Sequence, residues 1–253
     1  MRIIAIVNQK GGSGKTTTSV NVAASLAKEG KKVLLLDLDP QGSASLWFGK
    51  KDGKPLYDVF IENKEIDTAI TSTSYENLDI VPASNMLAGL EKALAGEVGS
   101  EMILKRKILN MDPKSYDYLL IDCPPTLGVL SLNALTAAKE VLIPVEAHVM
   151  ALQGLVQLLR TINAVQQRLN PALEISGILP CRVDQRTNHS KDIMKQLNSR
   201  FKDKVTKSFI RENVRLAEAP LHVKPIIHYD GSSNGANDYM SLAKEIMSKE
   251  IKS

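Results

Sequence analysis

The chain has 253 residues, 43% of them hydrophobic and 4% aromatic, with a formal net charge of +4. This length and composition suit one domain with a sizeable core, so we expect residues 1–253 to form a single domain. Cys123 and Cys181, the two cysteines, provide neither a disulfide framework nor metal-ligand spacing, which favours the reduced cytoplasm. No run approaches about 18 consecutive apolar residues, so a membrane-spanning helix is excluded.

Apolar runs of strand length alternate with amphipathic segments of helix length along most of the chain. This alternation predicts an α/β fold, a mostly parallel, twisted sheet covered by helices on both faces, with ligands at the carboxyl ends of the strands. Between residues 50 and 75 the periodicity fades, and we expect surface elaboration there. The expected strands are residues 2–7, 33–36, 78–81, 118–121, 141–145 and 175–179, and the expected helices are 16–29, 84–95, 130–138, 152–169, 189–201 and 237–251.

The segment between the first strand and the first helix reads Lys-Gly-Gly-Ser-Gly-Lys-Thr-Thr. It matches the end of the phosphate-loop pattern G-x-x-x-x-G-K-[ST], but Gln9 replaces the first glycine and Lys10 adds a second lysine. Its glycines let backbone N–H groups approach an anion at the helix N-terminus. Lys15 would reach the β- and γ-phosphates, and the Thr16 hydroxyl would bind Mg²⁺. The expected nucleotide-binding residues are Lys10, Gly11, Gly12, Ser13, Gly14, Lys15, Thr16 and Thr17.

Two further strands end in aspartates that would face the same phosphates. The second strand runs into Asp37 and Asp39. Asp39 would orient or deprotonate the attacking water or hold Mg²⁺ through water, with a helix N-cap as the alternative role. Asp37 is expected to be structural or to support the site residues from behind. Asp122 closes the fourth strand and would coordinate Mg²⁺ through water, and the Cys123 thiol beside it should be buried.

The charge is unevenly distributed along the chain. Residues 176–253 contain 14 Lys and Arg against 9 Asp and Glu, whereas residues 1–175 are close to neutral. A basic surface of this kind suits nucleic acid or anionic lipid, and an ordinary solvated surface accounts for it equally well.

Together, the loop and the two acidic motifs resemble those of the ParA/MinD family of deviant Walker ATPases. The resemblance runs from residue 2 to about residue 249 and is greatest to the chromosomal ParA subgroup, also called Soj. Further motifs similar to that subgroup are Asn133-Ala-Leu-Thr-Ala, Arg186-Thr-Asn and Asn213-Val-Arg-Leu-Ala-Glu-Ala-Pro. The resemblance implies a P-loop ATPase with ATP and Mg²⁺ as cofactors and slow intrinsic hydrolysis.

The family resemblance also implies a homodimer with ATP sandwiched between the subunits. Lys10 would cross to the partner's phosphates and act in catalysis with Lys15 and Asp39, much as an arginine finger acts in trans. Gly11 would lie where the two subunits approach most closely, so a bulky side chain there should block the sandwich.

Three C-terminal residues receive roles from the resemblance. Asn213 falls on the adenine side of the nucleotide, and Arg211, two residues before it, is also expected to bind the nucleotide. Arg186 and Arg215 fall where the subgroup binds DNA without sequence preference. Such binding neutralises phosphates, and a dimer would strengthen it by presenting two copies of the surface.

The implied function is partitioning of chromosome or plasmid DNA on the nucleoid, with a ParB-type partner that stimulates hydrolysis. An orphan relative that positions a protein cargo through an adaptor fits the same sequence. A MinD-like membrane-surface protein would need a basic amphipathic C-terminal helix, faintly suggested by Leu242, Ile246, Met247 and Ile251. A packed final helix is the simpler interpretation, so no stable membrane association is expected. The two cysteines do not suit an iron–sulfur carrier.

Three places depart from the subgroup pattern. Arg211 and Glu212 replace the usual Pro-Arg, which bears on the adenine-side contact. Residues 231–234 lack the arginines usual there. Trp47 and Phe48 stand where small residues are common, either as a buried staple behind the second motif or as a partner-facing aromatic patch.

Overall fold

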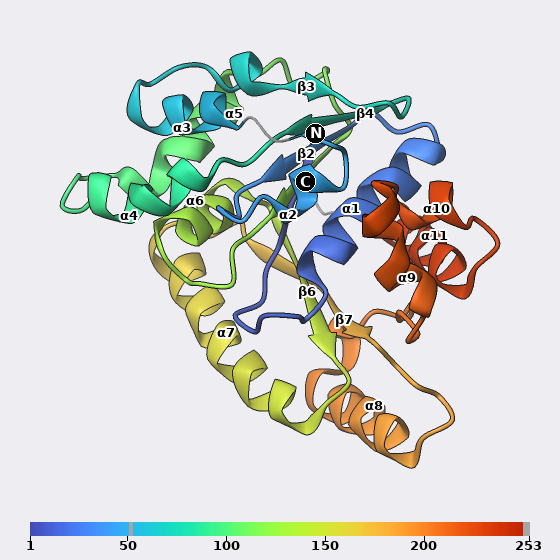
Figure 1. The fold of residues 1–253 in the computed structure, drawn as a ribbon. Helices are drawn as coiled ribbons and strands as arrows, with labels where there is room; N and C mark the ends of the chain where they lie inside the picture. The colour runs from blue at the N-terminus through green and yellow to red at the C-terminus, as the bar shows by residue number, and fades with distance from the viewer. Residues whose placement is uncertain (51–52, 250–253) are drawn as a thin grey trace.

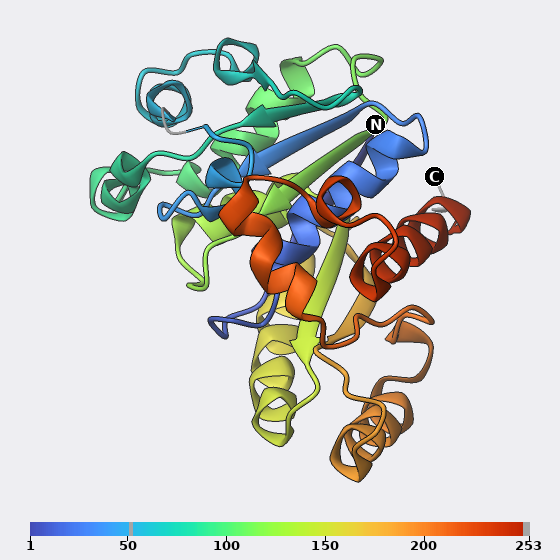
Figure 2. The ribbon, with the colours of Figure 1, turned by 45° about the vertical axis from the view of Figure 1, so that its right-hand side comes forward.

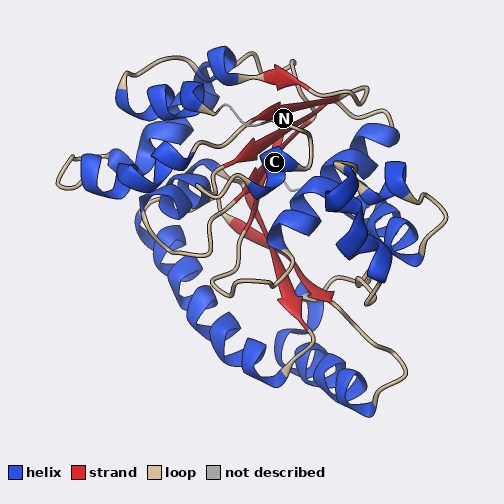
Figure 3. Ribbon diagram, viewed as in Figure 1, coloured by secondary structure: helices blue, strands red, loops and turns tan. Residues whose placement is uncertain are grey.

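The protein is described from a computed structural model that covers residues 1–50 and 53–249. Within these ranges, a seven-stranded sheet has the order β3-β4-β2-β5-β1-β6-β7, and only its β3–β4 pair is antiparallel (Figure 1 and Figure 3). The α/β class and the predicted strands are confirmed. The strands are β1 (Arg2–Ile6), β2 (Val33–Asp37), β3 (Thr71–Ser72), β4 (Leu78–Val81), β5 (Tyr118–Asp122), β6 (Glu140–Glu146) and β7 (Glu174–Cys181).

Helices cover both faces of this sheet, and Figure 2 shows the C-terminal helices gathered beside α1. One face carries α1 (Lys15–Lys28), α2 (Ser43–Leu46), α9 (Val214–Glu218), α10 (Ile226–Tyr229) and α11 (Asn234–Ser248). The other carries α3 (Lys54–Ile61), α4 (Leu90–Ala93), α5 (Ile103–Asn110), α6 (Val129–Ala137), α7 (Val149–Arg168) and α8 (Asn188–Phe201).

Side chains alternate between the two faces of β1, which explains why its residues 3–6 are all apolar. Ile3 and Ala5 pack into the core on one face, and Ile4 and Ile6 into the core on the other. Side chains alternate between the faces of a strand, so a sheet covered on both sides needs apolar residues at every position. Each fully buried Ile contributes about 1.5–3 kcal/mol to folding.

Two predicted segments differ from the structure. The helix expected over residues 84–95 is divided into a 3-10 helix at Asn85–Gly89 and the short α4. Gly89 lies at the break, where a helix-interior glycine is unfavourable by about 1 kcal/mol. The expectation of surface elaboration over residues 50–75 is wrong for α3, which places Leu56 and Phe60 in the core, whereas residues 61–65 are exposed and residues 51–52 lie outside the described ranges.

Packing decides two of the open alternatives. Trp47 and Phe48 are 6% and 9% exposed, so they form the buried staple and not a partner-facing patch. Leu242 and Ile246 of α11 are buried in the core that contains α1 residues, which confirms a packed final helix. Ile251 lies outside the described residues. Within the described ranges, no helix combines the length and apolarity needed to cross a membrane.

Candidate nucleotide-binding site

The phosphate loop joins β1 to α1. Gly12 and Gly14 have φ angles of 74° and 92°, a left-handed conformation that residues with a Cβ rarely adopt. Gly14 is the N-cap of α1 and supplies no side chain to cap it, so the first N–H groups of the helix face the loop. At Gly11 an added Cβ would meet nothing within 4 Å, which leaves this position open toward the outside.

Lys15 is the inner lysine of the loop and is only 7% exposed. Its Nζ donates to the backbone oxygen of Lys10 at 3.4 Å. Burial lowers the pKa of Lys15, and the carboxylates of Asp122 and Asp39 oppose this shift. The ammonium therefore lies within the field of both predicted acidic residues, as the sequence motifs require.

Lys10 lies at the outer end of the same loop, with 45% of its side chain exposed. Its backbone N–H donates to Asn8 Oδ1 at 3.0 Å, and Asn8 Nδ2 donates to the Pro144 oxygen at 2.6 Å. The Nζ of Lys10 donates to Glu146 Oε2 at 2.9 Å. Asn8 and Glu146 were not among the predicted site residues. The position of Glu146 at the carboxyl end of β6 was the signal that could have identified it.

Asp122 lies at the carboxyl end of β5, between β1 and β2. Its Oδ1 accepts a hydrogen bond from Ser19 Oγ at 2.8 Å. Its Oδ2 is buried and has no hydrogen-bond partner in the part of the chain that the structure describes. Burial raises the pKa of Asp122 to about 6, and the hydroxyls of Thr16 and Ser19 oppose that rise. An unpaired buried carboxylate oxygen beside a phosphate loop is a fitting place for a cation or its bound water.

Asp39 follows β2 and is 9% exposed. Its Oδ1 accepts from the Gln41 N–H at 3.0 Å, which closes a tight turn. The N-cap of the next helix is Gly42, so the alternative helix-capping role for Asp39 is wrong. The Asp39 carboxylate also acts on the pKa of Lys15. Cys123, next to Asp122, is fully buried as expected.

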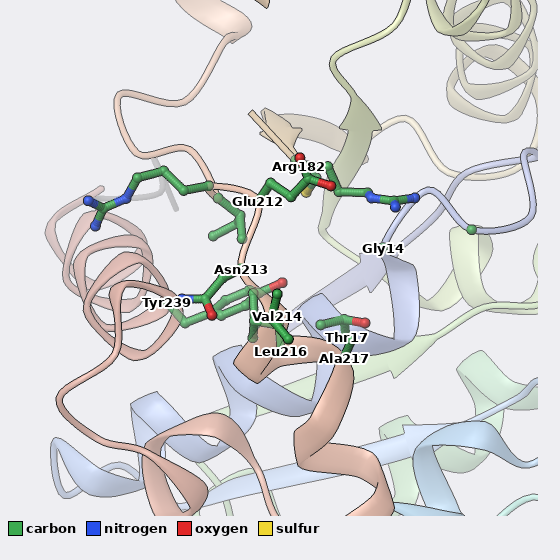
Figure 4. Close-up of a pocket in the computed structure, with 13 residues that line it drawn as sticks. Gly14, Thr17, Arg182, Glu212, Asn213, Val214, Leu216, Ala217 and Tyr239 are labelled. Atoms are coloured by element: carbon green, nitrogen blue, oxygen red, sulfur yellow. The ribbon is translucent and has the colours of Figure 1, made fainter. Parts of the chain in front are cut away.

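A cavity of about 360 Å³ opens beside the loop. Figure 4 shows the side chains of Thr17, Asn213 and Tyr239 meeting there from α1, from the start of α9 and from α11. Asn213 caps α9 by accepting the Arg215 N–H at 2.8 Å. Predominantly apolar walls with a few polar groups suit a planar base. The residues that line the cavity include Gly14, Thr17, Asn213, Leu216, Ala217 and Tyr239.

Arg211, predicted to bind the nucleotide, also lines this cavity. Its guanidinium is already held by Asp238, with Nη2 to Oδ1 at 2.6 Å, and its backbone N–H donates to Asp238 Oδ2 at 2.9 Å. The ion pair raises the pKa of Arg211. Arg211 therefore ties the cavity wall to α11, and a direct contact with nucleotide stays a prediction.

Comparison with known proteins shows the family of this chain. Residues 1–175 match a family model described as an AAA domain. The chain is 49% identical over 248 residues to the sporulation initiation inhibitor protein Soj of Bacillus subtilis (strain 168), covering 97% of this chain and 98% of that protein. It is 44% identical over 249 residues to the chromosome-partitioning ATPase Soj of Treponema pallidum (strain Nichols), covering 98% of each.

The chain belongs to the ParA/Soj family of ATPases. The predicted family is confirmed, and ATP hydrolysis is the activity of this family. Among solved structures, the cobyrinic acid a,c-diamide synthase of Mycobacterium smegmatis with bound ATP analogue and magnesium has a TM-score of 0.84 and 36% identity, over 98% of this chain and 94% of that one. MinD of Pyrococcus horikoshii OT3, complexed with Mg-ADP, has a TM-score of 0.79 and 27% identity, over 98% and 96%.

The two arginines predicted to bind DNA, Arg186 and Arg215, are both on the surface. The Arg186 side chain is 89% exposed and binds both oxygens of Asp184 at 2.9 Å. The Arg215 side chain is 54% exposed and contacts Glu218 at 2.8 Å and Asp230 at 3.5 Å. Each arginine is therefore accessible but partly neutralised by its own chain.

Asn133, from another ParA/Soj motif, has a structural role. It is fully buried on α6. Its Oδ1 accepts the Leu104 N–H at 2.9 Å, and its Nδ2 donates to the Ser100 and Val129 oxygens at 2.8 and 2.9 Å. These bonds join α6 to the start of α5 and satisfy an otherwise costly buried amide.

Proposed function

We propose that this chain is a single-domain, ATP-dependent dimerising ATPase that partitions chromosome or plasmid DNA on the nucleoid, in the cytoplasm, with a ParB-type partner. The observation that carries the proposal is the different setting of the two loop lysines. Lys15 is buried beside Asp122 and Asp39, where it serves its own subunit's phosphates. Lys10 is on the outside of the loop, where a second subunit can be reached.

The residues around the loop fit ATP with Mg²⁺. The Thr16 hydroxyl and the carboxylates of Asp39 and Asp122 are the hard oxygen donors that Mg²⁺ prefers. The unpaired Oδ2 of Asp122 needs such a partner. Across the described residues no cluster of three or more His, Cys, Asp or Glu forms a metal cage, which suits an ion that takes most ligands from phosphates and water. When bound, Mg²⁺ neutralises charge on the phosphates.

Side chains and backbone groups of the protein have the remaining roles in ATP hydrolysis. The Lys15 ammonium and the N–H groups at the start of α1 hold the phosphates. Asp39 orients or deprotonates the attacking water. Lys10 of the other subunit completes the charge stabilisation, so hydrolysis depends on dimerisation. Slow intrinsic turnover follows if a ParB-type partner is needed to bring these groups into line.

DNA binding is proposed to use Arg186 and Arg215 through phosphate neutralisation. Each arginine has a carboxylate partner, so one subunit presents a weak surface, and two subunits together gain avidity. A protein cargo positioned through an adaptor would use the same machinery. The structure of α11 does not favour binding to a membrane surface, because Leu242 and Ile246 are buried in the core.

Binding to non-specific duplex DNA tests the proposal, measured with ATP, with ADP and without nucleotide across a salt series. We expect salt-sensitive binding only with ATP, together with dimerisation by light scattering. Equal DNA binding in all three states, or an ATP-bound protein that stays monomeric, would contradict it.

A further inference from the structure

One carboxylate, Glu146, holds two cations at the edge of the nucleotide site. Its Oε2 accepts from Lys10 Nζ at 2.9 Å, and its Oε1 accepts from Arg182 Nη1 at 3.3 Å. Glu146 is the last residue of β6 and is paired with Cys181 of β7, which immediately precedes Arg182. The sheet therefore fixes Glu146 and the start of the Arg182 side chain, while the loop brings in Lys10.

Arg182 connects this ion cluster to the nucleotide cavity. It has a φ of 55°, in the left-handed region that a residue with a side chain enters only at a cost. It lines the cavity together with Gly12 and Gly14, and Figure 4 shows it on the same side as Gly14. The strained backbone of Arg182 therefore places its guanidinium between the cavity and Glu146.

The Glu146 contact conflicts with the proposed use of Lys10 in a dimer. Among the described residues, the Lys10 ammonium has one carboxylate partner on its own subunit, and reaching another subunit's phosphates means leaving that carboxylate. The Lys10 ammonium also holds the pKa of Glu146 below its usual range, so the carboxylate stays charged at neutral pH. An exposed ion pair is weak, whereas a lysine–phosphate contact is charge-assisted, so the exchange is favourable once a nucleotide-bearing partner is present.

We propose that Glu146 is a positioning residue for Lys10: it retains the lysine on its own subunit and releases it when an ATP-bound partner arrives. This inference rests on the proposed function, because it assumes that Lys10 acts across a dimer. Formation of one dimer breaks two Lys10–Glu146 pairs, one in each subunit. Since one exposed pair is worth a factor of about 1.4 to 5, removing both should tighten the ATP-bound dimer about 2- to 25-fold.

The first test needs no dimer. In the nucleotide-free full chain, the rate of Lys10 acetylation by acetic anhydride is measured by mass spectrometry in the wild type and in Glu146→Gln. We expect several-fold faster labelling of Lys10 in the variant, with other lysines unchanged. Glu174→Gln, which removes an exposed carboxylate at the opposite end of β7, is the matched control and should leave Lys10 labelling at the wild-type rate. Equal labelling in both variants would overturn the inference.

The second test is a double-mutant cycle on the ATP-dependent dimerisation constant. Glu146→Gln should tighten the dimer in the wild-type background and have no effect in a Lys10→Ala background, because no lysine remains to be retained. A merely structural role for Glu146 would change both backgrounds alike. A wild type that never dimerises with ATP would overturn the proposed function, and the acetylation result would then still decide whether Glu146 retains Lys10.

Discussion

Asp37 and Asp122 lie opposite each other at the carboxyl ends of the neighbouring strands β2 and β5. Both are fully buried, but their hydrogen bonding differs. Asp37 accepts from the Ser45 N–H at 2.8 Å, from Ser45 Oγ at 2.7 Å and from the Asp39 N–H at 3.1 Å. Asp122 keeps Oδ2 unpaired among the described residues. Asp37 therefore shapes the turn that presents Asp39, while Asp122 retains an oxygen for a ligand.

Replacement of Lys15 by Ala should abolish ATP binding. The buried ammonium lies in the field of Asp122 and Asp39, so its removal leaves those carboxylates to repel the phosphates. Titration with a fluorescent ATP analogue measures the effect. Lys28→Ala, at the exposed end of the same helix, should bind like the wild type. Micromolar or tighter affinity in Lys15→Ala would show that the loop assignment is wrong.

Asp39→Ala should trap an ATP-bound dimer. Without this carboxylate, the attacking water is neither oriented nor deprotonated, and phosphate release should fall by about 10²–10⁴-fold. The loss of the hydrogen bond from Gln41 is local, at the closed turn. Size-exclusion chromatography with light scattering, alongside a phosphate-release assay, measures both effects. A variant that hydrolyses ATP at the wild-type rate would remove Asp39 from the catalytic residues.

Gly11→Val should leave the subunit folded but block the dimer. A Cβ at Gly11 meets nothing within 4 Å in the subunit, so the position has open space there and the expected clash is with a partner. We expect a wild-type melting temperature, ATP binding within a few-fold of the wild type and no ATP-dependent increase in mass. An unfolded variant, or one that dimerises normally, would contradict a close approach at this glycine.

Arg215→Glu should weaken DNA binding and leave ATP-dependent dimerisation intact. If each subunit contributes one phosphate contact through Arg215, the salt dependence of the dimer's affinity should fall by about 2 in logarithmic slope. Arg106→Glu, on the exposed side of α5, makes the same change of charge on the other face of the sheet. If the two variants lose equal affinity, net charge and not a local contact is responsible.

Stability should decrease as the pH rises from about 5 to 8. Burial and the neighbouring Asp122 raise the pKa of Asp37 to about 8 in the folded chain, against about 3.9 when unfolded. In this range the folded state therefore binds the proton more tightly, and raising the pH favours unfolding. Asp37→Asn should flatten the dependence.

Thermal denaturation of the nucleotide-free protein at pH 5 and pH 8 measures this effect. A difference of 1 kcal/mol corresponds to about 2–4 °C for a chain of this size. Between pH 5 and pH 8 the melting temperature of the wild type should fall by at least this amount, and that of Asp37→Asn should fall by less. A wild-type melting temperature that is higher at pH 8 would contradict the assigned direction.

The sequence by itself determined the strand pattern, the phosphate loop and the two acidic motifs. These features are local: Lys15 and Thr16 directly follow the glycines, and Asp122 directly follows a buried strand. The sequence also predicted that the loop and the acidic residues lie close together, because parallel strands bring their carboxyl ends to one edge of the sheet. The core helix α3 was missed, since its short apolar stretch lies among polar residues whose burial depends on distant partners.

Only the tertiary structure decided which charges are paired. Lys10 and Glu146 are 136 residues apart in sequence, and Arg211 and Asp238 are 27 apart. Nothing in the spacing of these residues marks them as partners, because an ion pair depends on the distance between side chains after packing. The same holds for Asp37 and Asp122, which both end apolar strands. Hydrogen bonds from Ser45 and the Asp39 N–H satisfy both oxygens of Asp37, whereas Ser19 bonds one oxygen of Asp122 and the other is left for a ligand.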